Sequence, residues 1–298
     1  MNQSIKVITQ EEFSSHPLLA RLSELHNIPK KIYIIGNLPD VTIDQYGRST
    51  PRILTVVGSR KNTQYGKHVL EKLLSSLKGY DVIIISGLAL GIDGLAHSNA
   101  ISNKLITLAV PGSGLSKKVL YPSTHLHLAE DIVECGGALI SELEPDTSAA
   151  PWTFPARNRI MAALSDAVLV VEAEEKSGTL ITARQALELG KDIGAVPGEL
   201  FSPTSTGTNT LIREGAYIIT NEEDLYALLH LSSKKEENTY EEYTEDEARI
   251  MNILSETMEK DSLLIASSMS LETFLTTLTS LEIKGCIEET FGEVRRLV

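Results

Sequence analysis

The segment DVIIISGLALGIDGLAH at residues 81–97 contains the structural unit from which most of the chain is built. It begins with a continuous apolar run, passes through a turn that holds Gly87 and Gly91, and continues with helical apolar spacing. An apolar run without polar alternation is typical of a strand buried on both faces, as in a parallel sheet covered by helices. The segment therefore predicts a strand, a glycine turn and a helix in succession.

The same pattern recurs from about residue 51 to residue 230. Further strands are predicted at ILTVVG (53–58), LITLAVPG (105–112), GALISEL (137–143), AVLVVEA (167–173), DIGAVPG (192–198) and AYIIT (216–220). Helical spacing separates them at 65–77, 94–101, 157–165 and 179–190. Repeated strand–helix units predict an α/β fold with a doubly wound, mostly parallel sheet at 51–230.

The two ends of the chain differ from this pattern. Residues 1–50 predict an N-terminal leader and a first small element, with a helix in HPLLARLSELHN and a strand in KKIYIIGN. Residues 231–243 are polar and charged, which predicts a linker. Residues 244–298 predict three helices and then a two-stranded hairpin, the order of a small winged-helix domain.

Composition narrows the class of protein. The 298 residues include two cysteines, Cys135 and Cys286, too few for a disulfide framework or a cysteine-rich zinc site. The sequence has neither an apolar run long enough for a transmembrane helix nor a start typical of a secretory signal. We therefore expect a cytoplasmic protein with no membrane contact, no metal site and no cofactor.

The charge is strongly negative but unevenly spread. The chain has 27 Lys and Arg against 40 Asp and Glu, a net charge of −13, and residues 231–298 hold 7 of the cations and 15 of the acids. Because nucleic-acid binding depends on Lys and Arg, an anion site must be a local cluster in residues 1–230. The acidic end, with Arg295 and Arg296 near the terminus, favours a protein contact or a regulatory role over reading of duplex DNA.

Three glycine turns follow predicted strands. In a parallel sheet they fall at the carboxyl edge, where ligands bind. Glycine lets the backbone approach a phosphate, and the next helix offers free N–H groups. Tight turns without a ligand are the alternative interpretation. The candidate phosphate-binding residues in these turns are Gly58, Ser59 and Arg60, then Ser86, Gly87, Ala89, Gly91 and Asp93, and then Gly112 and Gly114.

A fourth polar cluster lies in WTFPARNR at residues 152–159. Arginine neutralises phosphates and an aromatic ring stacks on a base, so the DNA-binding candidates here are Phe154, Arg157, Asn158 and Arg159. The alternative is that the aromatic residues are core and that the arginines pair with acids. Further candidates are Lys176, Ser177, Gly178 and Thr179, although capping of the next helix is the favoured interpretation for the two hydroxyls.

Signals for catalysis are weak. Neither GxxxxGK[ST] nor GxGxxG is complete, so an NTPase or a dinucleotide oxidoreductase lacks its motif. Asp93 and His97 are four residues apart on one predicted helix, where they form either an acid/base pair or hydrogen bonds that fix the loop. No catalytic residue is predicted, and we expect a protein that is not an enzyme.

Taken together, the motifs resemble the DNA-processing protein A family (DprA, also called Smf). VVGSRKNTQYG, ISGLALGIDGLAH, WTFPARNRIMAALSDAVLVVEAEEKSGTLITARQALELGK and STGTNTLIREGA occur in the family's order, and the resemblance covers about residues 16–298. It implies an extended Rossmann-like domain that binds single-stranded DNA and helps to load the recombinase RecA in natural transformation. It also implies a homodimer, a C-terminal winged-helix domain, and DNA contacts at Arg60, at residues 86–93 and at Phe154.

This chain departs from the family's pattern at three places. Leu90 stands where the family often has Lys or Arg, residues 149–152 lack a lysine that some members carry, and Ala156 stands where Arg is common. Each change removes about one phosphate contact, so we expect weaker DNA binding than is usual for the family.

Two other classes of function fit parts of the sequence. The alternative is a nucleotide-binding enzyme or sensor of the lysine-decarboxylase-like Rossmann superfamily, although its PGGxGTxxE loop is incomplete at residues 111–115. A further alternative is an interaction scaffold whose acidic end binds a partner. That alternative predicts no response to oligonucleotides.

Overall fold

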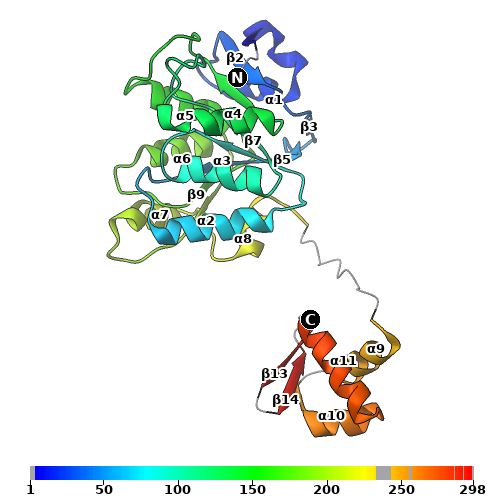
Figure 1. Cartoon of the computed structure of the whole chain (residues 1–298). Helices are drawn as coiled ribbons and strands as arrows, with labels where there is room; N and C mark the ends of the chain where they lie inside the picture. The colour runs from blue at the N-terminus through cyan, green and yellow to red at the C-terminus, as the bar shows by residue number, and fades with distance from the viewer. Residues whose placement is uncertain (1–3, 233–242, 255–256, 285, 291, 297–298) are drawn as a thin grey trace. The chain divides into compact units, whose positions relative to one another are not determined.

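The computed structural model describes residues 4–232, 243–254, 257–284, 286–290 and 292–296. It contains two compact units, Met1–Ser233 and Lys234–Val298 (Figure 1). The first unit includes both the expected N-terminal element and the expected strand–helix repeats. The predicted linker at 231–243 lies mostly outside the described residues.

A nine-stranded sheet, in the order β1-β2-β8-β7-β6-β5-β9-β10-β11, runs through the first unit. The strands from β8 to β11 in this order are parallel, whereas β2 is antiparallel to both of its neighbours. The predicted doubly wound, mostly parallel sheet is confirmed. The strands are β1 (Lys6–Thr9), β2 (Lys31–Gly36), β5 (Arg52–Val57), β6 (Val82–Ser86), β7 (Ile106–Ala109), β8 (Ala138–Ser141), β9 (Ala167–Val170), β10 (Asp192–Ala195) and β11 (Tyr217–Ile218).

Helices cover both faces of this sheet. One face carries α1 (Pro17–Ala20), the 3-10 turn η2 (Arg21–Glu24), α5 (Thr153–Leu164), α6 (Gly178–Glu188) and α7 (Thr206–Arg213). The other face carries α2 (Gln64–Ser76), α3 (Ile92–Ser102), α8 (Glu222–Leu228) and α4 (Leu126–Glu134). Figure 1 shows α2 and α3 side by side over the strands.

Strand β5 shows why the apolar runs lack polar alternation. Ile53 and Val57 pack in the core beneath α5 and α6, whereas Leu54 and Val56 pack in the core beneath α2 and α3. Successive side chains of a strand point to opposite faces, so both sets must be apolar when both faces are covered.

The strand order places a crevice beside β5. From β5 the chain adds β6, β7 and β8 on one side, and it then returns to add β9, β10 and β11 on the other. The connections after β5 and β9 therefore leave the sheet in different directions. Ligands of open α/β sheets bind at such a point, outside the carboxyl ends of the strands.

Shorter elements complete the first unit. A hairpin of β3 (Thr42–Ile43) and β4 (Ser49–Thr50) precedes β5, and 3-10 turns lie at η1 (Gln10–Ser15), η3 (Ser123–His125) and η4 (Pro203–Ser205). In the part of the chain that the structure describes, every helix is too short or too polar to cross a membrane.

The second unit has its own core around Phe274, Leu278 and Val294. Its elements are α9 (Glu245–Ile253), β12 (Thr257–Glu259), α10 (Lys260–Ser267), α11 (Leu271–Ile283), β13 (Ile287–Thr290) and β14 (Glu293–Arg296). The three helices and the hairpin lie where the sequence predicts them. Strand β12 was not predicted, and it pairs with β14 to make a three-stranded sheet. The assignment as a winged helix stays a prediction.

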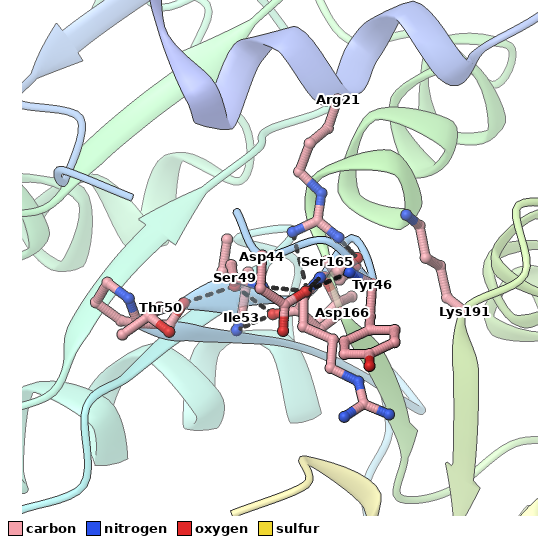
Figure 2. A network of polar contacts seen from close by, with 12 residues as sticks. Arg21, Asp44, Tyr46, Ser49, Thr50, Ile53, Ser165, Asp166 and Lys191 are labelled. Atoms are coloured by element: carbon pink, nitrogen blue, oxygen red, sulfur yellow. Dashed lines mark hydrogen bonds and ion pairs between the residues drawn. The ribbon is translucent and has the colours of Figure 1, made fainter. Parts of the chain in front are cut away.

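A buried ion pair ties the N-terminal segment to the amino edge of the sheet (Figure 2). Asp166, in the turn before β9, lies 3.1 Å from the Arg21 guanidinium, and both side chains are almost completely buried. The Asp166 carboxylate also accepts hydrogen bonds from the backbone N–H of Ser49 at 3.2 Å and of Ile53 at 2.8 Å, and from the Ser49 hydroxyl. Arg21 donates a second hydrogen bond to the Ser165 carbonyl at 2.6 Å. One carboxylate thus holds three separate segments.

We expect Asp166→Ala to lower the free energy of unfolding by about 3 kcal/mol or more, because it removes the counter-ion of a buried guanidinium and the acceptor of two buried N–H groups. Urea denaturation of the purified variant measures this loss. Asp131→Asn, on the exposed side of α4, serves as the control and should change stability by less than about 0.5 kcal/mol. Equal stability of the Asp166 variant and the wild type would show that the network is not needed.

Candidate nucleic-acid interface

A pocket of about 530 Å³ lies at the carboxyl ends of β5 and β9, where the strand order reverses. Its walls come from the turns after β5 and β6, from α5 and from the start of α6. The lining residues are Val57, Gly58, Ser59, Arg60, Lys61, Ala89, Asp93, Phe154, Pro155, Arg157, Asn158, Met161, Glu174, Ser177, Gly178, Thr179 and Thr182.

The pocket brings together most of the residues that the sequence singled out. Those at its wall are Gly58, Ser59, Arg60, Ala89, Asp93, Phe154, Arg157, Asn158, Ser177, Gly178 and Thr179. Those that do not line it are Ser86, Gly87, Gly91, Gly112, Gly114, Arg159 and Lys176. Segments more than a hundred residues apart in sequence therefore meet at one edge of the sheet.

The turn after β5 is held between two helices. The backbone N–H of Ile92 donates to the Ser59 carbonyl at 3.1 Å, and the Thr179 hydroxyl donates to the Gly58 carbonyl at 3.1 Å. Gly91 has a φ of +78°, and a Cβ there would lie 2.2 Å from the Ser59 carbonyl oxygen. Gly91 therefore serves the close contact between two turns and is not itself exposed to the pocket.

Arg60 and Phe154 meet at the rim of the pocket. The exposed Arg60 guanidinium lies 4.7 Å from the centroid of the Phe154 ring, within the range of a cation–π contact. The Tyr121 ring meets Phe154 edge to face, with the centroids 5.8 Å apart. A Cβ on Gly112 would lie 2.6 Å from the Phe154 ring. The third glycine turn thus supports Phe154 from behind.

Arg157 forms the floor of the pocket and is almost completely buried. Its Nη1 donates to the Val110 carbonyl at 2.7 Å and lies 3.9 Å from an Asp93 carboxylate oxygen. Burial raises the pKa of Asp93, and this effect outweighs the opposite influence of Arg157. Burial likewise lowers the pKa of Arg157 to about 10, which leaves it cationic at neutral pH. Its Nη1 is thus used inside the protein, whereas no hydrogen-bond partner of its buried Nε is found among the described residues.

Three candidates lie away from the pocket for physical reasons. Arg159 is two residues beyond Arg157, so the helical turn points it toward the other side of α5. There it donates to the Asn27 carbonyl at 2.6 Å and pairs with the Glu142 carboxylate. The Ser86 hydroxyl is buried and donates to the Val56 carbonyl at 2.7 Å, while Lys176 is exposed in the turn before α6.

Three charged or aromatic residues at the site were not predicted from the sequence. Lys61 adds a second exposed cation to the wall, and its position directly after the GSR turn was a signal that could have found it. Glu174 adds an exposed carboxylate. Tyr121 belongs to a loop far from Phe154 in sequence, so no local pattern indicates their contact.

Ser177 has the capping role that its alternative interpretation predicted. Its hydroxyl accepts a hydrogen bond from the Thr179 backbone N–H at 3.2 Å, at the start of α6. Beyond this cap, the N-terminus of α6 faces the pocket through Gly178 and Thr179. Over the described ranges, we find no cluster of three or more His, Cys, Asp or Glu side chains that would hold a metal ion.

His97 is completely buried on α3. Its Nδ1 lies 2.7 Å from the Thr107 hydroxyl oxygen, and that hydroxyl donates to the Ile84 carbonyl at 3.1 Å. No hydrogen-bond partner of the buried Nε2 is found in the part of the chain that the structure describes. Burial lowers the pKa of His97 to about 3, so the ring is neutral at physiological pH and is unsuited to acid/base work there.

The comparisons with known proteins agree on one family. The model of the family described as DNA recombination-mediator protein A matches residues 5–230. Protein Smf of Escherichia coli (strain K12) is 37% identical over 254 residues, 82% of this chain and 67% of that protein. DNA processing protein DprA of Bacillus subtilis (strain 168) is 40% identical over 205 residues, 69% of this chain and 66% of that protein. The chain spans about two thirds of the length of these two relatives.

Solved structures agree with this match. DNA processing protein A of Streptococcus pneumoniae superposes with a TM-score of 0.65 and 34% identity, over 76% of this chain and 74% of that one. DNA processing protein A of Helicobacter pylori, whose structure was described for its single-stranded DNA binding mode, gives a TM-score of 0.62 and 29% identity. That match covers 77% of this chain and 96% of the other.

We expect acid to destabilise the first unit partly through His97. With a pKa of about 3 in the folded chain and an ordinary value near 6.5 in the unfolded chain, only the unfolded chain takes up this proton between those values. The contribution of His97 to the free energy of unfolding is therefore fully present above about pH 6.5. Below that pH, the free energy of unfolding falls by up to about 1.4 kcal/mol per pH unit.

Urea unfolding of His97→Asn across this pH range tests the assignment. The slope of the free energy of unfolding against pH should decrease by the equivalent of about one proton. Above about pH 7.5, the difference in this free energy between the variant and the wild type should stay constant. An unchanged slope below pH 6.5 would mean that His97 is not the group responsible.

Proposed function

Because this chain belongs to the DNA recombination-mediator protein A family, we propose that its pocket binds single-stranded DNA during DNA processing in natural transformation. The observation that carries the proposal is the placement of Arg60 against Phe154 at the rim of a pocket at the strand-order reversal. A cation and an aromatic ring together are the means by which proteins hold phosphates and bases of a single strand. The Helicobacter pylori relative described for single-stranded DNA binding supports the same class of ligand.

Phosphate groups are proposed to lie at the rim. The Arg60 guanidinium is exposed and has the fork geometry that suits two phosphate oxygens. Lys61 supplies a second exposed charge, and the N-terminus of α6 offers backbone N–H groups near Gly178. Arg157 contributes its charge from below without needing to reach the ligand.

A base is proposed to stack at Phe154, which is half-buried with its ring facing Arg60. Guanidinium planes also stack on bases, so Arg60 and Phe154 form one mixed surface. The carboxylates of Asp93 and Glu174 in the same wall offset part of the positive charge. Together with the departures at Leu90 and Ala156, this favours modest affinity.

The partners are proposed from family membership. We propose that the bound strand is passed to RecA and that the chain acts as a homodimer. Two linked pockets would grip one strand with higher avidity than either pocket alone. In this scheme the protein protects and presents DNA and catalyses no reaction.

The second unit is proposed to be a winged-helix domain that contacts protein. Two of its cations are engaged by its own acids, since Lys260 pairs with Glu289 at 2.7 Å and Lys284 pairs with Glu247 at 3.1 Å. A duplex-reading wing would offer its cations to phosphates instead.

A nucleotide-binding role remains the second candidate because a pocket of about 530 Å³ is large enough for one nucleotide. Thermal-shift measurements with mononucleotides and with oligonucleotides separate the two functions. A strand-binding protein should respond to oligonucleotides more strongly than to any mononucleotide at the same phosphate concentration. The reverse order would favour the nucleotide enzyme or sensor.

We expect Arg60→Ala to weaken binding of a fluorescent oligothymidylate about tenfold or more, because one charge-assisted phosphate contact is lost. The slope of log affinity against log salt should fall by about 0.7 for the lost contact. Fluorescence anisotropy at several salt concentrations measures both quantities.

The matched control is Lys78→Ala, which removes an exposed cation that follows α2 at the opposite edge of the sheet. It should leave affinity and slope close to the wild-type values. The proposal fails if Arg60→Ala binds like the wild type, or if the wild type prefers duplex to single-stranded DNA.

A further inference from the structure

Tyr121 places a second aromatic ring at the rim of the pocket. Its side chain is 44% exposed although it contacts Phe154. A scattered exposed ring is ordinary on a protein surface. Tyr121 differs because its ring is joined through Phe154 to Arg60, so one ring–ring contact and one cation–π contact link all three side chains.

The backbone that carries this ring is well fixed. The Tyr121 N–H donates to the Ser113 hydroxyl at 3.1 Å, and Ser113 is completely buried. The Ser113 hydroxyl in turn donates to the Gly114 carbonyl at 3.0 Å, within the third glycine turn. Pro122, the next residue, is buried. Since the loop is already ordered, stacking of a ligand on this ring costs little conformational entropy of the protein.

The two rings offer different surfaces. Their planes meet at 66°, and the Phe154 ring already holds the Arg60 guanidinium. A single flat base cannot lie parallel to both rings at once. Bases from successive nucleotides can, if the strand bends where it passes from one ring to the other.

We propose that Tyr121 is a second base-stacking residue, which takes the base next to the one held at Phe154 and Arg60. The ligand of the site is then a strand of at least two nucleotides, since a mononucleotide would leave one ring unused. This inference rests on the proposed function and extends its site beyond the pocket to the loop between β7 and α4.

The experiment compares oligothymidylate with an abasic deoxyribose-phosphate oligomer of the same length, since the abasic strand keeps the phosphates and lacks the bases. Tyr121→Ala should weaken oligothymidylate binding roughly 5- to 100-fold, as expected for the loss of one stacked base. It should leave binding of the abasic oligomer unchanged. Tyr121→Phe keeps the ring and should bind both strands like the wild type.

Tyr46→Ala is the matched control. Tyr46 is 73% exposed and lies beside Arg48 with a ring–guanidinium distance of 5.7 Å, but it precedes β5 at the opposite edge of the sheet. It should not affect either strand.

The outcomes separate the two proposals. If Tyr121→Ala binds oligothymidylate like the wild type while Arg60→Ala does not, the stacking role of Tyr121 is wrong and the proposed function stands. If Tyr121→Ala weakens both strands equally, Tyr121 only supports Arg60 and Phe154, and the inference is again overturned. If the wild type binds no single strand, the proposed function itself fails.

Discussion

The buried guanidinium of Arg157 is the interaction on which the site depends. From α5 it reaches the carbonyl of Val110 after β7 and the carboxylate of Asp93 on α3, and it fills the space where a side chain at Gly87 would be. Three connections at the carboxyl edge of the sheet are thereby held around one cation. Truncating a buried charge of this kind leaves its partner uncompensated, which makes such a contact costly to lose. The shape of the site therefore depends on Arg157, which the sequence motif indicated as a DNA-binding residue.

The charged groups at the two edges of the sheet have different kinds of partner. At the amino edge, Asp166 holds the N-terminal segment through Arg21, Ser49 and Ile53 in a mostly buried network. At the carboxyl edge, the Arg60 guanidinium contacts the Phe154 ring, and no ion pair of Arg60 with a carboxylate is found among the described residues. An arginine held by an aromatic ring is positioned and yet keeps its hydrogen-bond donors for a ligand. This difference leaves an exposed guanidinium at one edge of the sheet in a chain of net charge −13.

Much of the fold could be predicted from the sequence because apolar runs and glycine turns are local signals. All of the strands predicted within 51–230 are present, and each ends one to three residues earlier than predicted. Strands β1, β3, β4 and β12 were missed, since β3 and β4 have only two residues each and β1 and β12 depend on pairing with a distant segment. The first of the site's turns was found for the same local reason, through Gly58, Ser59 and Arg60.

The sequence by itself determined the α/β alternation, the family and the set of residue types that could meet a phosphate. Only the tertiary structure decided which of these reach the pocket. It turned Arg159 toward Glu142, buried Ser86 against the backbone of Val56, and brought Lys61 and Tyr121 to the rim. The physical reason is that strand and helix periodicity are set by near neighbours, whereas the direction and pairing of a polar side chain are set by atoms from segments that only folding brings together.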